Sequence, residues 1–264
     1  MVSRDDKTDM AHIVAILNQK GGVGKTTTAI NVAAYLAKQG QSVLVVDLDP
    51  QGNATSGLGM SHNAEDQGTY HVMLEEAKAM DVVKPVTEHL HVLPTDAQLA
   101  ALEIELVDKP ERETVLRRAL ENLDYDYVFI DCPPALSLLT VNALTAADSL
   151  LIPVQAEYYA LEGLSQLLNV VQMVRNGLNP NLELLGVVMT MYDGRTTLSE
   201  QVKDEVTQHF GDKVFDVVVP RNVRLAEAPS HGKHIFDHDK WSKGAKAYKN
   251  LAKEVHHRAK GKKL

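Results

Sequence analysis

Residues 18–28 read Asn-Gln-Lys-Gly-Gly-Val-Gly-Lys-Thr-Thr-Thr, a set of glycines, lysines and hydroxyls that suits the binding of phosphate groups. Glycines let the backbone close around an anion without a Cβ in the way, and the amides then point at the phosphates. The motif predicts that Lys25 reaches the β- and γ-phosphates of a nucleotide and that the Thr26 hydroxyl binds Mg²⁺. The alternative is a glycine-rich turn without a nucleotide, which the strand and helix patterns flanking the loop disfavour.

A second lysine, Lys20, departs from the ordinary pattern of such loops, and Gln19 stands where the motif has its first glycine. Lys20 is either a solvated surface lysine or a group aimed at phosphates that its own loop cannot present to it. The second interpretation implies a partner subunit whose nucleotide faces this one. The chemistry of the loop alone leaves both interpretations open.

Acidic residues follow two of the expected strands. Asp131 ends the run Tyr-Val-Phe-Ile and is placed like a Walker B acid, which holds the Mg²⁺ shell, although an Asp at a strand end can also simply cap a turn. Asp47 and Asp49 leave another strand two residues apart, so their side chains fall on the same face. We assign metal binding to Asp47 and water positioning to Asp49, which begins a Pro-Gln-Gly loop. A positioned water predicts hydrolysis.

The elements that must position these residues alternate along the chain. Short, almost continuous apolar runs are typical of strands buried on both faces, and helical patterns lie between most of them. This order predicts a single-domain α/β fold, a doubly wound, mostly parallel sheet flanked by helices, with ligands at the carboxyl ends of the strands. Strands are expected at 13–17, 43–46, 90–93, 127–130, 150–154, 184–189 and 214–219, helices at 27–38, 111–123, 137–146, 161–174 and 199–210, and a loop at 52–67.

Charge is distributed unevenly over the 264 residues, whose net charge is −8. Residues 232–264 contain ten Lys or Arg and three Asp or Glu, a net charge of +7, whereas the preceding 231 residues contain 17 basic and 32 acidic groups, a net charge of −15. A basic end on an acidic body predicts binding of an anionic polymer or surface there. One cysteine excludes an internal disulfide framework, and no apolar run approaches the length of a membrane span.

Three ordered motifs resemble the deviant Walker ATPases of the ParA family. They are Lys-Gly-Gly-Val-Gly-Lys-Thr-Thr at 20–27, Val-Asp-Leu-Asp-Pro-Gln-Gly-Asn at 46–53 and Ile-Asp-Cys-Pro-Pro at 130–134. Further stretches at 154–163, 190–196 and 220–230 are similar to the chromosomal ParA/Soj branch. The similarity runs from about residue 12 to about residue 255. It implies a P-loop ATPase domain over 11–264, preceded by a polar extension of residues 1–10.

The resemblance implies roles for individual residues. Lys20 matches the signature lysine that contacts the phosphates of the opposite subunit in an ATP-sandwich homodimer, and Asp49 matches the acid needed for hydrolysis. Contacts to ATP and Mg²⁺ in the same chain are implied for the loop and for positions beside the adenine. The expected nucleotide-binding residues are Lys20, Gly21, Gly22, Val23, Gly24, Lys25, Thr26, Thr27, Met191, Pro220 and Asn222; the expected catalytic residues are Lys20, Lys25 and Asp49; the expected metal-binding residues are Thr26, Asp47 and Asp131.

The basic C-terminal region, residues 232–264, is where we expect DNA to bind. A helix over about 241–260 has one apolar stripe for packing and a second stripe of lysines, which is either a solubilising face or a phosphate-contacting surface. Because no aromatic residues are interleaved with these lysines, we expect contact with the duplex backbone rather than base readout. The expected DNA-binding residues are Arg195, Arg224, Lys233, Lys243 and Lys246, of which Arg195 and Arg224 match positions linked to DNA binding in the family.

The resemblance further implies an ATP-dependent switch in chromosome or plasmid segregation. Its dimer would bind double-stranded DNA non-specifically, and its slow hydrolysis would be stimulated by the centromere-binding partner ParB. Such a protein is cytoplasmic, bacterial and associated with the nucleoid, with no membrane contact. The alternatives are a MinD-like ATPase that positions a membrane or protein cargo, a metabolic P-loop enzyme such as a dethiobiotin synthetase, and a DNA-binding regulator that uses ATP only as a conformational ligand.

Overall fold

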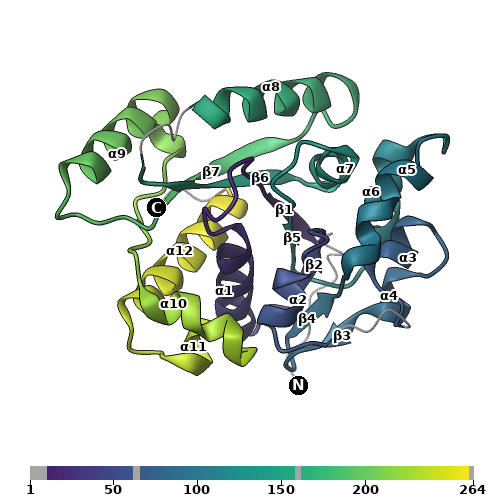
Figure 1. Cartoon of the computed structure of the whole chain (residues 1–264), viewed down its shortest axis with the longest axis horizontal. Coiled ribbons are helices and arrows are strands. Elements are labelled where there is room, and N and C mark those ends of the chain that lie inside the picture. The colour runs from purple at the N-terminus through teal and green to yellow at the C-terminus, as the bar shows by residue number, and fades with distance from the viewer. Residues whose placement is uncertain (1–10, 62–65, 158–161, 262–264) are drawn as a thin grey trace.

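The computed structural model describes residues 11–61, 66–157 and 162–261. Its centre is a sheet of seven strands in the order β3-β4-β2-β5-β1-β6-β7, parallel throughout except for the short pair β3–β4. The expectation of a doubly wound, mostly parallel sheet flanked by helices is therefore confirmed (Figure 1). The strands are β1 (His12–Ile16), β2 (Val43–Asp47), β3 (Lys84–Pro85), β4 (Leu90–Leu93), β5 (Tyr127–Asp131), β6 (Ser149–Gln155) and β7 (Glu183–Thr190).

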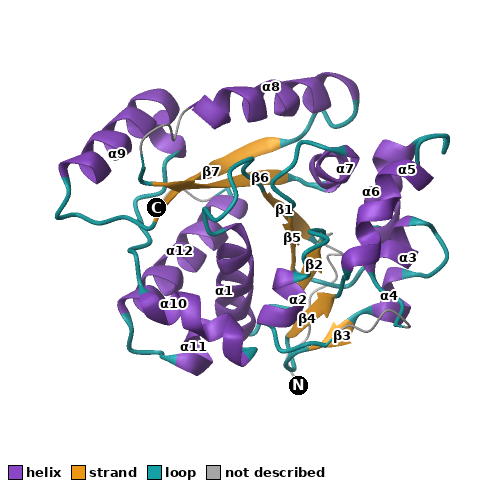
Figure 2. Cartoon of the chain, in the orientation of Figure 1, coloured by secondary structure: helices purple, strands orange, loops and turns teal. Residues whose placement is uncertain are grey.

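Helices cover both faces of the sheet (Figure 2). The α-helices before β5 are α1 (Lys25–Lys38), α2 (Asn53–Gly57), α3 (Thr69–Met73), α4 (Ala79–Val82), α5 (Leu102–Glu105) and α6 (Val115–Leu120). Those after β5 are α7 (Leu138–Ala146), α8 (Glu162–Gly177), α9 (Thr197–Phe210), α10 (Val223–Glu227), α11 (Ile235–His238) and α12 (Lys243–Ala259). Short 3₁₀ turns lie at Ala97–Ala101, Arg112–Thr114, Gly211–Lys213 and Ala228–His231.

Alternate residues of each strand enter two separate apolar cores. In β1, Val14 and Ile16 pack under α1 and α12, whereas Ala15 packs on the opposite face, under α7. Burial on both faces explains why the strands read as continuous apolar runs in the sequence. The buried face of α12 comes from the predicted apolar stripe, with Tyr248, Leu251 and Val255 at most 1% exposed.

Two sequence expectations need correction. The segment 214–219 is not a strand. It runs beside β7, with hydrogen bonds from Phe215 N to Val187 O (2.8 Å) and from Val219 N to Met189 O (2.8 Å), but amides between these two do not bond to β7. Asp216 N and Val217 N donate to the carboxylate of Glu254 on α12, which interrupts the ladder. The stretch 52–67, expected to be a loop, contains α2.

Other boundaries differ modestly from the expectations. The helix expected at 111–123 is shorter, a 3₁₀ turn followed by α6. The C-terminal helix, expected at about 241–260, begins at Lys243, because the Ser242 hydroxyl accepts a bond from Ala245 N and caps it. The extension 1–10 and residues 158–161, within the motif at 154–163, lie outside the described residues.

Candidate nucleotide-binding site

The glycine loop joins β1 to α1 at the carboxyl edge of the sheet. Gly22 (φ 73°) and Gly24 (φ 88°) adopt positive φ, which side chains with a Cβ avoid, and Gly24 serves as the N-cap of α1. The hydroxyl of Thr190, at the end of β7, donates to Val23 O (2.8 Å) and fixes the loop from outside. Within the described part of the chain the amides of residues 21–24 donate to no acceptor. Such a row of free donors at a helix N-terminus fits an anion such as a phosphate.

Lys25 is buried beneath this loop. Its side chain is 7% exposed, and its Nζ donates to the carbonyl of Lys20 (3.3 Å). Burial lowers the pKa of the Lys25 amine, and the negative charge of Asp131 acts in the opposite direction. An ammonium held under a ring of amides is placed to neutralise phosphate charge.

Asp131 is a buried carboxylate with no assigned use in the fold. It is fully buried, and neither of its oxygens has a well-formed hydrogen bond to any described residue. Burial raises its pKa well above the usual range, and the charge of Asp47 adds to this, whereas the nearby Thr26 hydroxyl lowers it. Orphaned polar atoms of this kind are rare in native proteins and call for a partner. Carboxylate and hydroxyl oxygens are the ligands that Mg²⁺ prefers, so Asp131 and Thr26 fit the ion.

Asp47 has a different environment although it pairs with Asp131 in register across β2 and β5. Its Oδ2 accepts bonds from both the amide and the hydroxyl of Thr55 (2.7 Å each), and its Oδ1 accepts a longer bond from Asp49 N (3.3 Å). Burial nevertheless raises the pKa of Asp47 to about 7. The carboxylate that was expected to bind metal is thus engaged in holding α2 against the end of β2.

Asp49 begins the loop between β2 and α2. It is 8% exposed, and its Oδ1 accepts a bond from Gln51 N (3.0 Å), which closes a tight turn. Among the described residues no hydrogen bond reaches the second carboxylate oxygen, which lies at the same edge of the sheet as the glycine loop. Asp49 and Lys25 are close enough for their charges to interact.

Lys20 lies at the exposed rim of the site. Its Nζ is 3.2 Å from Glu157 Oε2, and the two side chains are 46% and 44% exposed. Glu157 also lies 3.5 Å from the guanidinium of Arg221. Glu157 follows β6, and sequence reasoning missed it even though it obeys the rule that polar groups at the carboxyl ends of strands share one edge.

A pocket of about 310 Å³ opens beside the loop, lined in part by Gly24 and Thr27. The three residues expected beside the adenine, Met191, Pro220 and Asn222, all line it, and Thr190 and Tyr248 are further lining residues that the sequence did not indicate. Met191 has φ 50°, an unusual value for a residue with a long side chain, which directs the chain around the pocket. The pocket wall is mostly apolar side chains, as suits a planar base.

The residues expected to bind DNA are all exposed. Arg195 precedes α9 and is bound to Asp193 (2.6 Å), whereas Arg224 on α10 pairs with Glu227 (2.8 Å). A parallel bridge between Tyr192 and Pro220 aligns the two segments that lead to these arginines. The lysines of the set lie in the turns and the helix that follow α10, at Lys233, Lys243 and Lys246.

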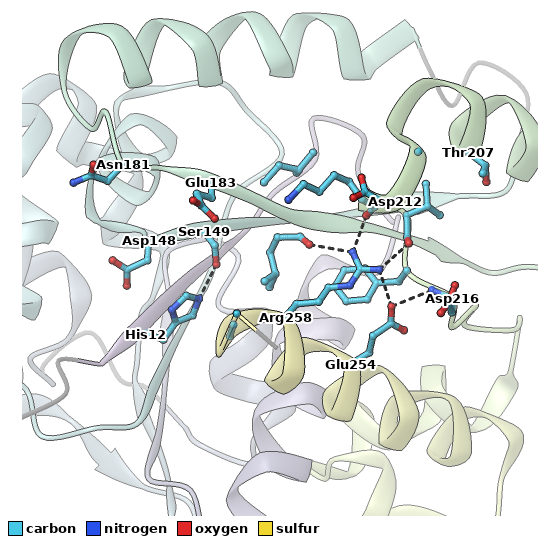
Figure 3. A pocket seen from close by; sticks show the side chains of 18 of the residues that line it. His12, Asp148, Ser149, Asn181, Glu183, Thr207, Asp212, Asp216, Glu254 and Arg258 are labelled. Carbon is cyan, nitrogen blue, oxygen red and sulfur yellow. Dashed lines mark hydrogen bonds and ion pairs between the residues drawn. The ribbon is translucent and has the colours of Figure 1, made fainter. Parts of the chain in front are cut away.

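A second, larger pocket of about 940 Å³ lies at the opposite edge of the sheet, where β1, β6 and β7 begin (Figure 3). Arg258 of α12 crosses it, donating to the carbonyls of Leu185, Lys213 and Val214 and pairing with Glu254 (2.8 Å). The His12 ring bonds to the Ser149 hydroxyl at 2.9 Å on its far side. These contacts join β1 to β6, and they join α12 to β7 and to the segment after β7.

Comparisons with known proteins agree with this geometry. Residues 11–184 match the model of a family described as an AAA domain. The chain is 57% identical over 249 residues to the sporulation initiation inhibitor protein Soj of Bacillus subtilis, covering 93% of this chain and 98% of that protein. It is 56% identical over 242 residues to the chromosome-partitioning ATPase Soj of Thermus thermophilus, covering 92% and 94% of the two chains.

A solved structure has the same fold. The chain superposes with a TM-score of 0.84, at 37% identity, on cobyrinic acid a,c-diamide synthase from Mycobacterium smegmatis with a bound ATP analogue and magnesium, covering 97% of this chain and 98% of that one. In the described part of the chain, no helix is both long and apolar enough to cross a membrane.

Proposed function

The chain belongs to the Soj/ParA family of chromosome-partitioning ATPases, and we propose that it acts as an ATP-dependent switch whose dimer binds DNA. It is an ATPase and uses ATP and Mg²⁺. We further propose which residues bind the nucleotide, the metal ion and DNA, and how hydrolysis is coupled to DNA binding.

In the proposed hydrolysis, a water oxygen forms a bond to the γ-phosphorus while the bond from that phosphorus to the β–γ bridging oxygen breaks, which yields ADP and phosphate. Asp49 orients the water through its available oxygen, and Lys25 balances the charge that develops on the phosphates. Mg²⁺, held by Thr26 and Asp131, would add to the neutralisation of phosphate charge. Met191, Pro220 and Asn222 would hold the adenine.

Lys20 is proposed to reach the phosphates bound by a second copy of the chain. Its position at the exposed rim supports this role, since a side chain committed to its own loop would be buried like Lys25. The ion pair with Glu157 is half-exposed and therefore worth little, so it does not prevent Lys20 from leaving.

The exposed cations of the C-terminal region are proposed to contact the phosphates of duplex DNA. Dimerisation doubles this surface and raises avidity without any new contact, which makes DNA binding dependent on ATP. A ParB-type partner would stimulate hydrolysis, after which the ADP-bound chains separate and release DNA. In its ATP-bound, dimeric state the protein would reside on the bacterial nucleoid.

One observation supports the proposal most directly. The amides of residues 21–24, which donate to no acceptor among the described residues, and the Asp131 carboxylate, which has no well-formed hydrogen bond among them, lie at one edge of the sheet, while Lys20 remains at its exposed rim. A metabolic P-loop enzyme needs the first two features but has no use for the third.

Binding of a labelled DNA duplex, measured across a salt series, tests the proposal. With ATP and Mg²⁺ the native chain should bind, with a Kd that rises steeply with salt, and with ADP it should not bind. Lys20→Ala should abolish binding in ATP, because the dimer no longer forms. Binding that is equal in ADP, in ATP and in the variant would contradict the switch, and no binding in any state would favour a metabolic or membrane role for this ATPase.

A further inference from the structure

Trp241 is the one tryptophan of the chain, and its side chain is 87% exposed. It lies in the turn between α11 and α12. Tryptophan is a largely buried residue in most proteins, so an almost fully exposed indole needs an explanation. Val223, at the start of α10, is also exposed, at 70%.

The turn that carries Trp241 is fixed in place. Trp241 N donates to Asp239 Oδ1 (3.1 Å), and the other carboxylate oxygen of Asp239 lies 3.7 Å from Nε of Arg224. On the other side, Ser242 caps α12. One carboxylate therefore ties the indole's backbone to an arginine expected to bind DNA.

The surroundings of the indole are cationic. Lys240 Nζ lies 5.2 Å from the centre of the Trp241 ring, within the range of a cation–π contact. Lys243 and Lys246 follow, both exposed. The carboxylates on this surface, Asp239 and Glu227, already face Arg224. An apolar ring among cations matches a partner that is anionic and also presents apolar surface.

We propose that Trp241 contacts duplex DNA, laying its indole against sugars and base edges while Arg224 and Lys243 bind phosphates. The inference rests on the proposed DNA binding and adds to it a contact that does not depend on charge. The sequence expectation of backbone contact alone counted no aromatic residue among the lysines of the helix expected over about 241–260, although Trp241 stands at its start; in the structure Trp241 lies just before α12. Apolar side chains that insert into a groove are a known supplement to phosphate contacts.

A membrane surface is the less suitable partner. A helix that binds membranes needs a wide apolar face, whereas the apolar face of α12 is packed against α1, with Leu251 and Val255 fully buried. Among the described residues of α12 and the turn before it, Trp241 is the exposed large apolar side chain, which is too little to anchor a protein in lipid.

Because Trp241 is the one tryptophan of the chain, the intrinsic indole fluorescence reports on its environment. With a non-hydrolysable ATP analogue, titration of the native chain with duplex DNA should change the indole fluorescence with the same midpoint as the anisotropy of a labelled duplex. Trp241→Ala should weaken binding about tenfold without changing the salt slope, since no phosphate contact is lost. Lys243→Ala should lower the slope by about 0.9 for each Lys243–phosphate contact that the dimer loses. Trp241→Phe should retain most of the affinity.

Ile104→Ala is the matched control, because Ile104 is 80% exposed on α5, which packs on the opposite face of the sheet. It should leave DNA binding unchanged. If Trp241→Ala binds within twofold of the native chain and the fluorescence does not respond, the inference is wrong while the DNA switch stands. A response to vesicles of anionic phospholipid but not to DNA also overturns it. Absence of DNA binding by the native chain would remove the proposed function itself.

Discussion

At the scale of residues, two buried carboxylates in equivalent positions have acquired different tasks. Asp131 has no well-formed hydrogen bond among the described residues, whereas Oδ2 of Asp47 accepts two bonds from Thr55 and its Oδ1 accepts a longer one from Asp49 N. We therefore propose Asp131 as the metal ligand and Asp47 as the anchor for the loop that begins at Asp49. The motif placed both at the right edge of the sheet. It could not divide their roles, because Thr55 lies in a segment that read as a loop.

A prediction at this scale concerns pH. Burial lowers the pKa of His12 below its usual value of about 6.5, although the carboxylates of Asp148 and Glu183 oppose the shift. At a pH between the lowered pKa of His12 in the folded chain and its usual value in the unfolded chain, only the unfolded chain binds the proton. The free energy of unfolding therefore falls as the pH drops below about 6.5. The slope from one histidine is at most about 1.4 kcal/mol per pH unit.

His12→Gln tests this expectation, since glutamine keeps a polar group for the Ser149 hydroxyl but does not titrate in this range. Denaturant unfolding at several pH values between 8 and 5.5 should show a smaller loss of stability in the variant than in the native chain. Equal losses in both proteins would show that His12 does not contribute to the pH dependence.

At the scale of elements, the turn after the end of α2 and the turn after Ala228–His231 approach each other backbone to backbone, at Gly59 and Gly232. A Cβ on Gly59 would lie 2.8 Å from Gly232 O, and one on Gly232 would lie 2.6 Å from Gly59 Cα. The contact joins the loop that begins at Asp49 to the segment that lines the base pocket. Neither glycine stands out in the sequence, because the reason for each lies about 170 residues away along the chain.

Gly59→Ala should therefore impair both stability and turnover. Gly40→Ala is the matched control, because Gly40 has a similar φ (83° against 78°) but open space around the added methyl. The control should cost about 1 kcal/mol of unfolding free energy. Gly59→Ala should cost about 1–3 kcal/mol more through overpacking. It should also lower kcat for ATP about tenfold by displacing the Asp49 loop. Equal kcat in the two variants would contradict the positioning role.

Element boundaries show where sequence reasoning reaches its limit. The parallel strands and α1 were predictable because burial on both faces and the glycine loop leave strong local patterns. The segment 214–219 has the composition of a strand, yet Glu254, nearly 40 residues later, takes two of its amides. That competition is tertiary, so no local pattern reveals it. The pairing of Lys20 with Glu157 is also tertiary, and the sequence offers only the general signal that Glu157 follows a strand and so shares an edge of the sheet with the glycine loop.

At the scale of the whole molecule, the uneven distribution of charge and the two-fold repetition in the proposed dimer explain the proposed DNA binding. The net charge of +7 in residues 232–264 against −15 in the rest predicts one basic region, and the structure places Arg224 and the lysines of α12 in neighbouring elements there. In the proposed function, one chain would offer a small set of phosphate contacts. Two chains joined across their nucleotides would offer twice as many, which is why the proposed dimer is central to function.

The molar mass in solution, measured by sedimentation in Mg²⁺ with ADP or ATP, tests this central claim most directly. Asp49→Ala should bind ATP without hydrolysing it, so the variant should sediment as a stable dimer in ATP and as a monomer in ADP. Adding Lys20→Ala to this variant should restore the monomer in ATP. A mass that is the same in ADP and ATP, or a dimer that persists without Lys20, would contradict the nucleotide-sandwich switch.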